Sequence, residues 1–151
     1  MTPIFKIKPF AALSAAEVYQ VLQLRSEVFV VEQNCVYQDI DGKDDKALHL
    51  IGTIDSKIVA YARLFAPGYY FDNASIGRVV VSPQYRAHKF GHLLMTAAIA
   101  GVETHFNTKE ITISAQLYLK KFYEGHGFVQ QGEGYLEDDI PHIRMDFRFM
   151  N

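Results

Sequence analysis

The fold of this chain is decided by the stretch SIGRVVVSPQYRAHKFG, which runs from Ser75 to Gly91. It begins with a β-branched run typical of a buried strand, turns at Pro83, and ends in a cationic, glycine-bearing segment that opens an apolar helix. This order brings free backbone N–H groups and the positive end of a helix dipole to one point. The stretch therefore predicts an anion site, usually for phosphate, although an ordinary strand-to-helix connection has the same pattern.

The length and composition of the chain predict one globular domain over residues 1–151. A formal net charge of −2 gives no general attraction to nucleic acid or to an anionic membrane. The N-terminus lacks the apolar core of a signal peptide and no apolar run could span a bilayer, so a cytoplasmic protein is expected. Cys35 is the single cysteine, which excludes an intrachain disulfide.

Hydrophobic periodicity predicts alternating strands and helices. Ser14 and Glu17 form a capping box that starts a helix expected to end near Val31. Further helices are predicted from Phe90 to Val102 and over 117–126, and strands over 4–8, 48–54, 58–65, 75–82, 110–115 and 143–149. Polar segment 32–47 is expected to be a loop or broken helix. This order predicts an α/β (α+β) fold with a mixed central β-sheet and helices on both faces.

Two motifs in this pattern resemble known signatures. Val81-x-Pro83 followed by Arg86-x-x-x-x-Gly91 is similar to the acetyl-CoA signature Arg/Gln-x-x-Gly-x-Gly/Ala of the GNAT N-acetyltransferases. The run YEGHGF, residues 123–128, is similar to their second signature, Tyr-x-x-x-Gly-Phe. More narrowly, the chain resembles the ElaA-like branch in LR at 24–25, VFVVEQ at 28–33, Tyr37, DG at 41–42, IGRVVV at 76–81 and IPHI at 140–143.

The resemblance extends over nearly the whole chain and implies a GNAT fold and an activity. The expected activity is an acetyl-CoA-dependent N-acetyltransferase, in which a primary amine attacks the thioester directly. The acceptor would be a small amine or a peptide amine. The oligomeric state is left open, with a homodimer as one option. The residues expected to bind acetyl-CoA are Val79, Val80, Val81, Arg86, Ala87, His88, Lys89, Phe90, Gly91 and His92.

One position departs from the signature. Lys89 stands where the first glycine is expected, and glycine there permits a positive φ and close approach of the backbone to phosphate. Lys89 would add a cationic contact instead. The alternative function is therefore a non-catalytic GNAT-fold module that binds CoA or acyl-CoA without turnover.

The resemblance also assigns catalytic roles. Tyr123 would protonate the departing thiol, and its alternative role is that of a half-buried core tyrosine. An alkyl ammonium, with an ordinary pKa near ~10.4, must lose a proton before it attacks. Glu32 at the end of the first helix and His142 before the last strand are the two candidate bases, with Asp138 and Asp139 as weaker ones. A solvated glutamate and a structural histidine are the alternatives.

Charge gives one further expectation about the acceptor. Two acidic segments, 39–45 and 133–139, are expected to be loops at the acceptor groove, where carboxylates would favour a cationic amine. The alternative is that these acids only keep exposed loops soluble. His88 and His92 have the i, i+4 spacing of a metal pair, but no third ligand is evident, so no metal site is predicted.

Overall fold

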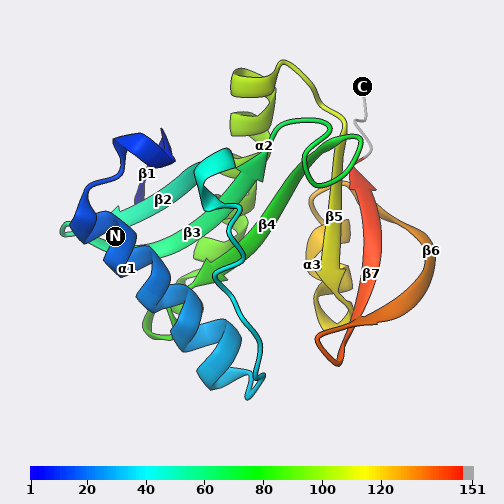
Figure 1. Cartoon of the computed structure of the whole chain (residues 1–151), viewed down its shortest axis with the longest axis horizontal. Helices are drawn as coiled ribbons and strands as arrows, with labels where there is room; N and C mark the ends of the chain where they lie inside the picture. The colour runs from blue at the N-terminus through cyan, green and yellow to red at the C-terminus, as the bar shows by residue number, and fades with distance from the viewer. Residues whose placement is uncertain (148–151) are drawn as a thin grey trace.

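A computed structural model of the chain describes residues 1–147 and is built on one seven-stranded sheet, ordered β1-β2-β3-β4-β5-β7-β6 (Figure 1). Neighbouring strands are antiparallel except β4 and β5, which are parallel. The strands are β1 Ile4–Pro9, β2 Leu48–Ile54, β3 Lys57–Phe65, β4 Ala74–Val81, β5 Ile111–Gln116, β6 Phe128–Glu137 and β7 Ile140–Phe147.

Helices cover both faces of the sheet, as expected. Figure 1 shows α1 (Ala15–Arg25) in front of the first strands and α2 (Phe90–Phe106) behind them. The capping box of Ser14 and Glu17 is formed. Val21 and Leu24 of α1 belong to one buried cluster, whereas α2 packs into the larger cluster on the opposite face. The remaining helices are short: α3 is Lys120–Glu124, and 3-10 turns span Phe10–Ala12, Asp44–Lys46, Pro83–His88 and Leu117–Leu119.

The first helix does not end as a regular α-helix. It continues as a π-helix over Ser26–Glu32, with bonds from Gln33 N–H to the Val28 carbonyl (3.1 Å) and from Cys35 N–H to the Val30 carbonyl (3.0 Å). A π turn changes the angular spacing of side chains, so the α-helical spacing does not apply beyond Arg25. Such turns often occur at functional sites.

Strand β6 is not predicted from the sequence, where a loop is expected over 133–139. The strand runs to Glu137, and only the turn at Asp138 and Asp139 lies between it and β7. Most of β6 is exposed at the sheet edge, and a register shift separates Gln131 from Tyr135, so the strand lacks the alternation that marks a half-buried strand. The last strand begins at Ile140 rather than 143; residues 148–149 of the expected strand lie outside the described residues.

The feature that creates the site is the divergence of β4 from β5. These parallel strands pair only at Ala74–Ile111 and Ser75–Thr112, and the strands then separate. The pairing of β3 with β4 shifts register between Tyr61 and Arg63, opposite Arg78, which has a positive φ of 50°. A bulge of this kind bends its strand. The sheet is therefore forked towards the carboxyl ends of β4 and β5.

Candidate functional site

A cavity of about 440 Å³ occupies the fork between β4 and β5. Its walls include residues of both signatures that lie far apart in the sequence. Of the residues predicted to act at the site, those that line the cavity are Val79, Val80, Val81, Arg86, Gly91, Tyr123, His142 and the weaker candidate base Asp138. The structure thus brings together the strand, the start of α2, the second signature and the last strand.

The segment between β4 and α2 has the geometry predicted for an anion site. A 3-10 turn at Pro83–His88 leads to Lys89, which adopts the left-handed conformation with φ 60° and ψ 27°, and α2 begins at the next residue. Lys89 therefore has the backbone geometry for which glycine is preferred at this position. The first N–H groups of α2 have no partner within the helix and are available to an anion.

Three other residues of this segment have structural contacts. The side chain of Phe90 is buried in a small cluster with Val59, so it has a core role, whereas its backbone N–H belongs to the start of α2. The ring of His88 stacks on Phe90 at 5.3 Å. His92 Nδ1 lies 2.9 Å from His126 Nε2, so the two histidines of the i, i+4 pair have different neighbours.

Arg86 and Glu32 form a bidentate ion pair. The Nη1 and Nη2 atoms of Arg86 donate to the Glu32 carboxylate at 2.7 and 2.5 Å, and both side chains are nearly half exposed. The hydrogen bonds from Arg86 and its charge lower the pKa of Glu32. Because a carboxylate with a lowered pKa is a weaker base, and Glu32 is not among the described residues that line the cavity, His142 has the better position of the two candidate bases.

Tyr123 lies on α3 and lines the cavity. It is buried, and its ring meets Phe128 edge-on with the centroids 6.0 Å apart. Burial raises the pKa of the Tyr123 phenol, so the hydroxyl holds its proton at neutral pH. This hydroxyl has no hydrogen-bond partner among residues 1–147. It can therefore donate to a group that enters the cavity.

His142 is fixed by its backbone and has one free ring nitrogen directed at a carboxylate. Its Nδ1 lies 2.7 Å from the carbonyl oxygen of Ile140, which can only accept, so Nδ1 carries the proton. Nε2 lies 3.4 Å from a carboxylate oxygen of Glu137. The ring stacks on Tyr135 with the centroids 6.2 Å apart. A histidine held in one tautomer with an available Nε2 can accept a proton.

In the sequence Glu137 stands out only as one of the acids of segment 133–139, expected on a loop at the acceptor groove, and its contact with His142 is not predicted. It lies at the end of β6, lines the cavity, and accepts a hydrogen bond from Ser114 Oγ at 3.3 Å. Ser114 is in turn 2.5 Å from the hydroxyl of Tyr135. Recognising the β6–β7 hairpin would have placed these side chains on one edge.

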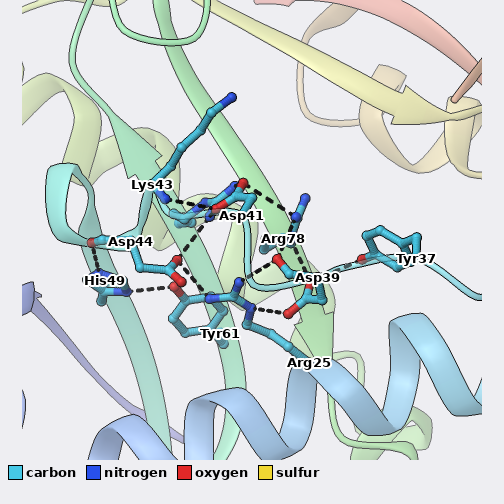
Figure 2. Close-up of polar contacts among 10 residues, drawn as sticks. Arg25, Tyr37, Asp39, Asp41, Lys43, Asp44, His49, Tyr61 and Arg78 are labelled. Atoms are coloured by element: carbon cyan, nitrogen blue, oxygen red, sulfur yellow. Dashed lines mark hydrogen bonds and ion pairs between the residues drawn. The ribbon is translucent and has the colours of Figure 1, made fainter. Parts of the chain in front are cut away.

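Most carboxylates of the acidic segment 39–45 are paired with arginines and do not form an open acidic surface. Figure 2 shows Asp39, Asp41 and Asp44 turned inward to basic side chains. Arg25 Nε donates to Asp39 at 2.8 Å and its Nη1 to Asp44 at 2.9 Å, and the Arg25 side chain is fully buried. Arg63 and Arg78 also form ion pairs with these aspartates, so three arginines balance the charge of three carboxylates. We name these six residues the Arg–Asp cluster.

The Arg–Asp cluster ties the loop to the bulge of β4. Arg78 Nε lies 2.7 Å from Asp39 Oδ1, and its Nη2 donates to the Asp39 carbonyl at 2.9 Å (Figure 2). Burial opposes ionisation of Asp41, but the hydrogen bonds and charge of Arg63 outweigh it and lower the pKa of Asp41 to about 2. The expectation that this loop attracts a cation is therefore wrong for Asp39, Asp41 and Asp44.

Comparison with known proteins gives the family. The family model described as acetyltransferase (GNAT) domain matches residues 12–149. Protein ElaA of Escherichia coli K12 is 43% identical over 135 residues, 88% of each chain. The crystal structure of E. coli ElaA has a TM-score of 0.87 at 39% identity, over 96% of this chain and 99% of that one.

A second solved structure is equally similar. An acyl-CoA N-acyltransferase from Pseudomonas aeruginosa has a TM-score of 0.89 at 42% identity, over 96% of this chain and 99% of that one. No helix among residues 1–147 is long and apolar enough to cross a membrane. The forked sheet, the two signatures and these relatives agree, and the chain belongs to the GNAT acetyltransferase family, in its ElaA-like branch.

Proposed function

We propose that this protein is an N-acetyltransferase that moves an acetyl group from acetyl-CoA to a primary amine by direct attack on the thioester. The observation that carries the proposal is the cavity in the fork, because its lining combines a phosphate-type helix start with Tyr123 and His142. GNAT proteins use acyl-CoA donors; acetyl as the acyl group and an amine as the acceptor belong to the proposal.

The residues present fit a CoA pyrophosphate. The N–H groups at the start of α2 and the cationic side chains of Arg86 and Lys89 would hold the phosphates. A Cβ added at Gly91 would meet only Phe122, at 3.5 Å, which is ordinary contact. Arg86 would exchange the Glu32 carboxylate for a phosphate. Val79, Val80 and Val81 would pair along the pantetheine arm, with a strand N–H as the donor to the oxyanion.

The proposed reaction transfers the acetyl group from the sulfur of acetyl-CoA to the nitrogen of the amine. His142 Nε2 takes one proton from the ammonium, and the freed lone pair forms a C–N bond to the thioester carbonyl carbon. The carbonyl π electrons move to oxygen and return as the C–S bond breaks. The nitrogen releases its second proton to solvent, His142 returns the proton it accepted to solvent, and Tyr123 protonates the sulfur and recovers a proton from solvent. One proton is released for each amide and thiol formed.

Thiol release from acetyl-CoA across a panel of amines and peptides tests the activity. Tyr123→Phe should lower kcat by about 10- to 1,000-fold with little change in acetyl-CoA affinity, because it removes a proton donor needed in the transition state. The outcome that contradicts the role of Tyr123 is an unchanged kcat. In that case the thiolate leaves unaided or another group protonates it.

Calorimetry separates the enzyme from the alternative, a non-catalytic CoA-binding module. Acetyl-CoA should bind the wild-type protein and Gly91→Ala, because the site has room for a methyl group. Gly91→Asp should abolish binding, because it sets a carboxylate against the phosphates. Binding without thiol release for any amine or peptide would favour the module. No binding at millimolar acetyl-CoA would refute both functions.

A further inference from the structure

We infer that Glu137 selects the acceptor by binding its ammonium group, so that the substrate is a small, cationic primary alkyl amine. The inference rests on the proposed function and assigns Glu137 a specificity role. Glu137 ends β6 beside the free Nε2 of His142, and its side chain is 44% exposed at the cavity. A carboxylate placed there meets the acceptor nitrogen where the proposed proton transfer begins.

Two acidic residues line the cavity, Glu137 and Asp138, and of these Glu137 is the one whose carboxylate is held by neighbouring side chains within residues 1–147. Asp39, Asp41 and Asp44 are offset by the Arg–Asp cluster, and Glu32 is paired with Arg86. Within residues 1–147, no lysine or arginine lies at ion-pair distance from Glu137; its one such neighbour is His142. A cationic acceptor that enters the cavity can therefore pair with a carboxylate that no lysine or arginine within residues 1–147 already neutralises.

Ser114 positions this carboxylate. Ser114 Oγ donates to Glu137 Oε1, and the hydroxyl of Tyr135 shares the same serine oxygen. The other carboxylate oxygen, Oε2, faces His142. Since Ser114 is on β5 and Tyr135 on β6, the sheet itself fixes the side chain of Glu137. An ammonium bound to Glu137 would lie next to the imidazole Nε2 that accepts its proton.

The cavity also limits the size of the acceptor. Its volume of about 440 Å³ includes the channel for the thioester arm as well as the acceptor end. The lining includes the aromatic residues Phe29, Phe65, Tyr70 and Phe71 as well as the acidic residues Glu137 and Asp138. Aromatic walls beside a carboxylate suit an alkyl chain that carries an ammonium group.

The test compares Glu137→Gln with wild-type enzyme in the thiol-release assay, using n-butylamine as a cationic acceptor and hydroxylamine as a neutral one. KM for n-butylamine should rise by about 5- to 30-fold, since a hydrogen bond to a charged group is lost at a partly exposed site. KM for hydroxylamine should change less than about twofold, because no ionic contact is lost. In wild-type enzyme, KM for n-butylamine should also rise with ionic strength.

Two variants serve as controls. Glu133→Gln removes the same charge from an exposed residue of β6 outside the cavity lining, and its KM values should match wild type. Glu137→Asp keeps the charge and should keep the salt dependence. A Glu137→Gln enzyme with unchanged KM for n-butylamine overturns the inference while leaving the acetyltransferase intact, as does a fall in kcat alone, which would mean that Glu137 acts through His142. Wild-type enzyme that acetylates neither amine refutes the inference, and failure with the whole panel refutes the proposed function too.

Discussion

Lys89→Gly is expected to stabilise the protein, because Lys89 is held in the left-handed region at φ 60°. A residue with a Cβ in that region costs roughly 1–2 kcal/mol relative to the right-handed conformation. Glycine removes this cost, but it raises the entropy of the unfolded chain and so gives back about 0.5–1 kcal/mol. The net gain in the free energy of unfolding is therefore about 0.5–1 kcal/mol.

Lys89→Ala is the matched control for this change. Both variants remove the ammonium group, but alanine keeps the Cβ and hence the strain. The glycine variant should exceed the alanine variant by about 0.5–1 kcal/mol in urea unfolding, or by about 1–4 °C in melting temperature for a chain of this size. A glycine variant that is no more stable than the alanine variant would refute the reasoning, since it would show that relief of the left-handed strain does not exceed the entropy cost of glycine.

The same two variants separate the effect of the Lys89 charge on acetyl-CoA binding from the effect of its backbone conformation. If the ammonium contacts the pyrophosphate, both variants bind more weakly than wild type, by about two- to fivefold for an exposed charge pair. If the backbone geometry matters more, the glycine variant binds more tightly than the alanine variant. Calorimetry at two salt concentrations distinguishes the two effects, because only the charge contribution is screened.

Two further predictions follow from the ion pairs. Glu32→Gln should tighten acetyl-CoA binding by up to about fivefold, because Arg86 no longer has to leave a carboxylate for a phosphate, and weaker binding would contradict this exchange. The lowered pKa of Asp41, about 2, means that its ion pair stabilises the folded protein above its ordinary pKa of 3.8 and that this stabilisation is lost as the pH falls through about 2. Urea midpoints measured from pH 5 to pH 2 should therefore fall, with a flatter slope in Asp41→Asn.

Local signals made much of the fold predictable. The capping box of Ser14 and Glu17 started α1, and the β-branched run before Pro83 marked β4. Strand β6 was missed for a physical reason: an edge strand exposed on most of its length has no buried face to impose alternation. The error carried over to the site, because Glu137 was placed on a loop instead of opposite Ile140 in the β6–β7 hairpin.

The candidate site was predictable where the chemistry lies within one segment. The signature around Arg86 and the helix start at Phe90 are contiguous, so their geometry follows from the sequence. The state of an acidic side chain is different, because its counterion can come from any element. Nothing near Asp39 in the sequence indicates that Arg25 and Arg78, from a helix and a strand, neutralise it.

The Arg–Asp cluster therefore has an architectural role rather than a role in attracting substrate. Arg78 is the left-handed residue in the bulge of β4, and Asp39 holds its guanidinium through both the carboxylate and the backbone carbonyl. The bulge lies where β4 separates from β5, and that separation makes room for the cavity. Carboxylates that are neutralised in shaping the cavity cannot also bind a cationic ligand, which is why the specificity role is proposed for Glu137, a residue with no arginine at ion-pair distance within residues 1–147.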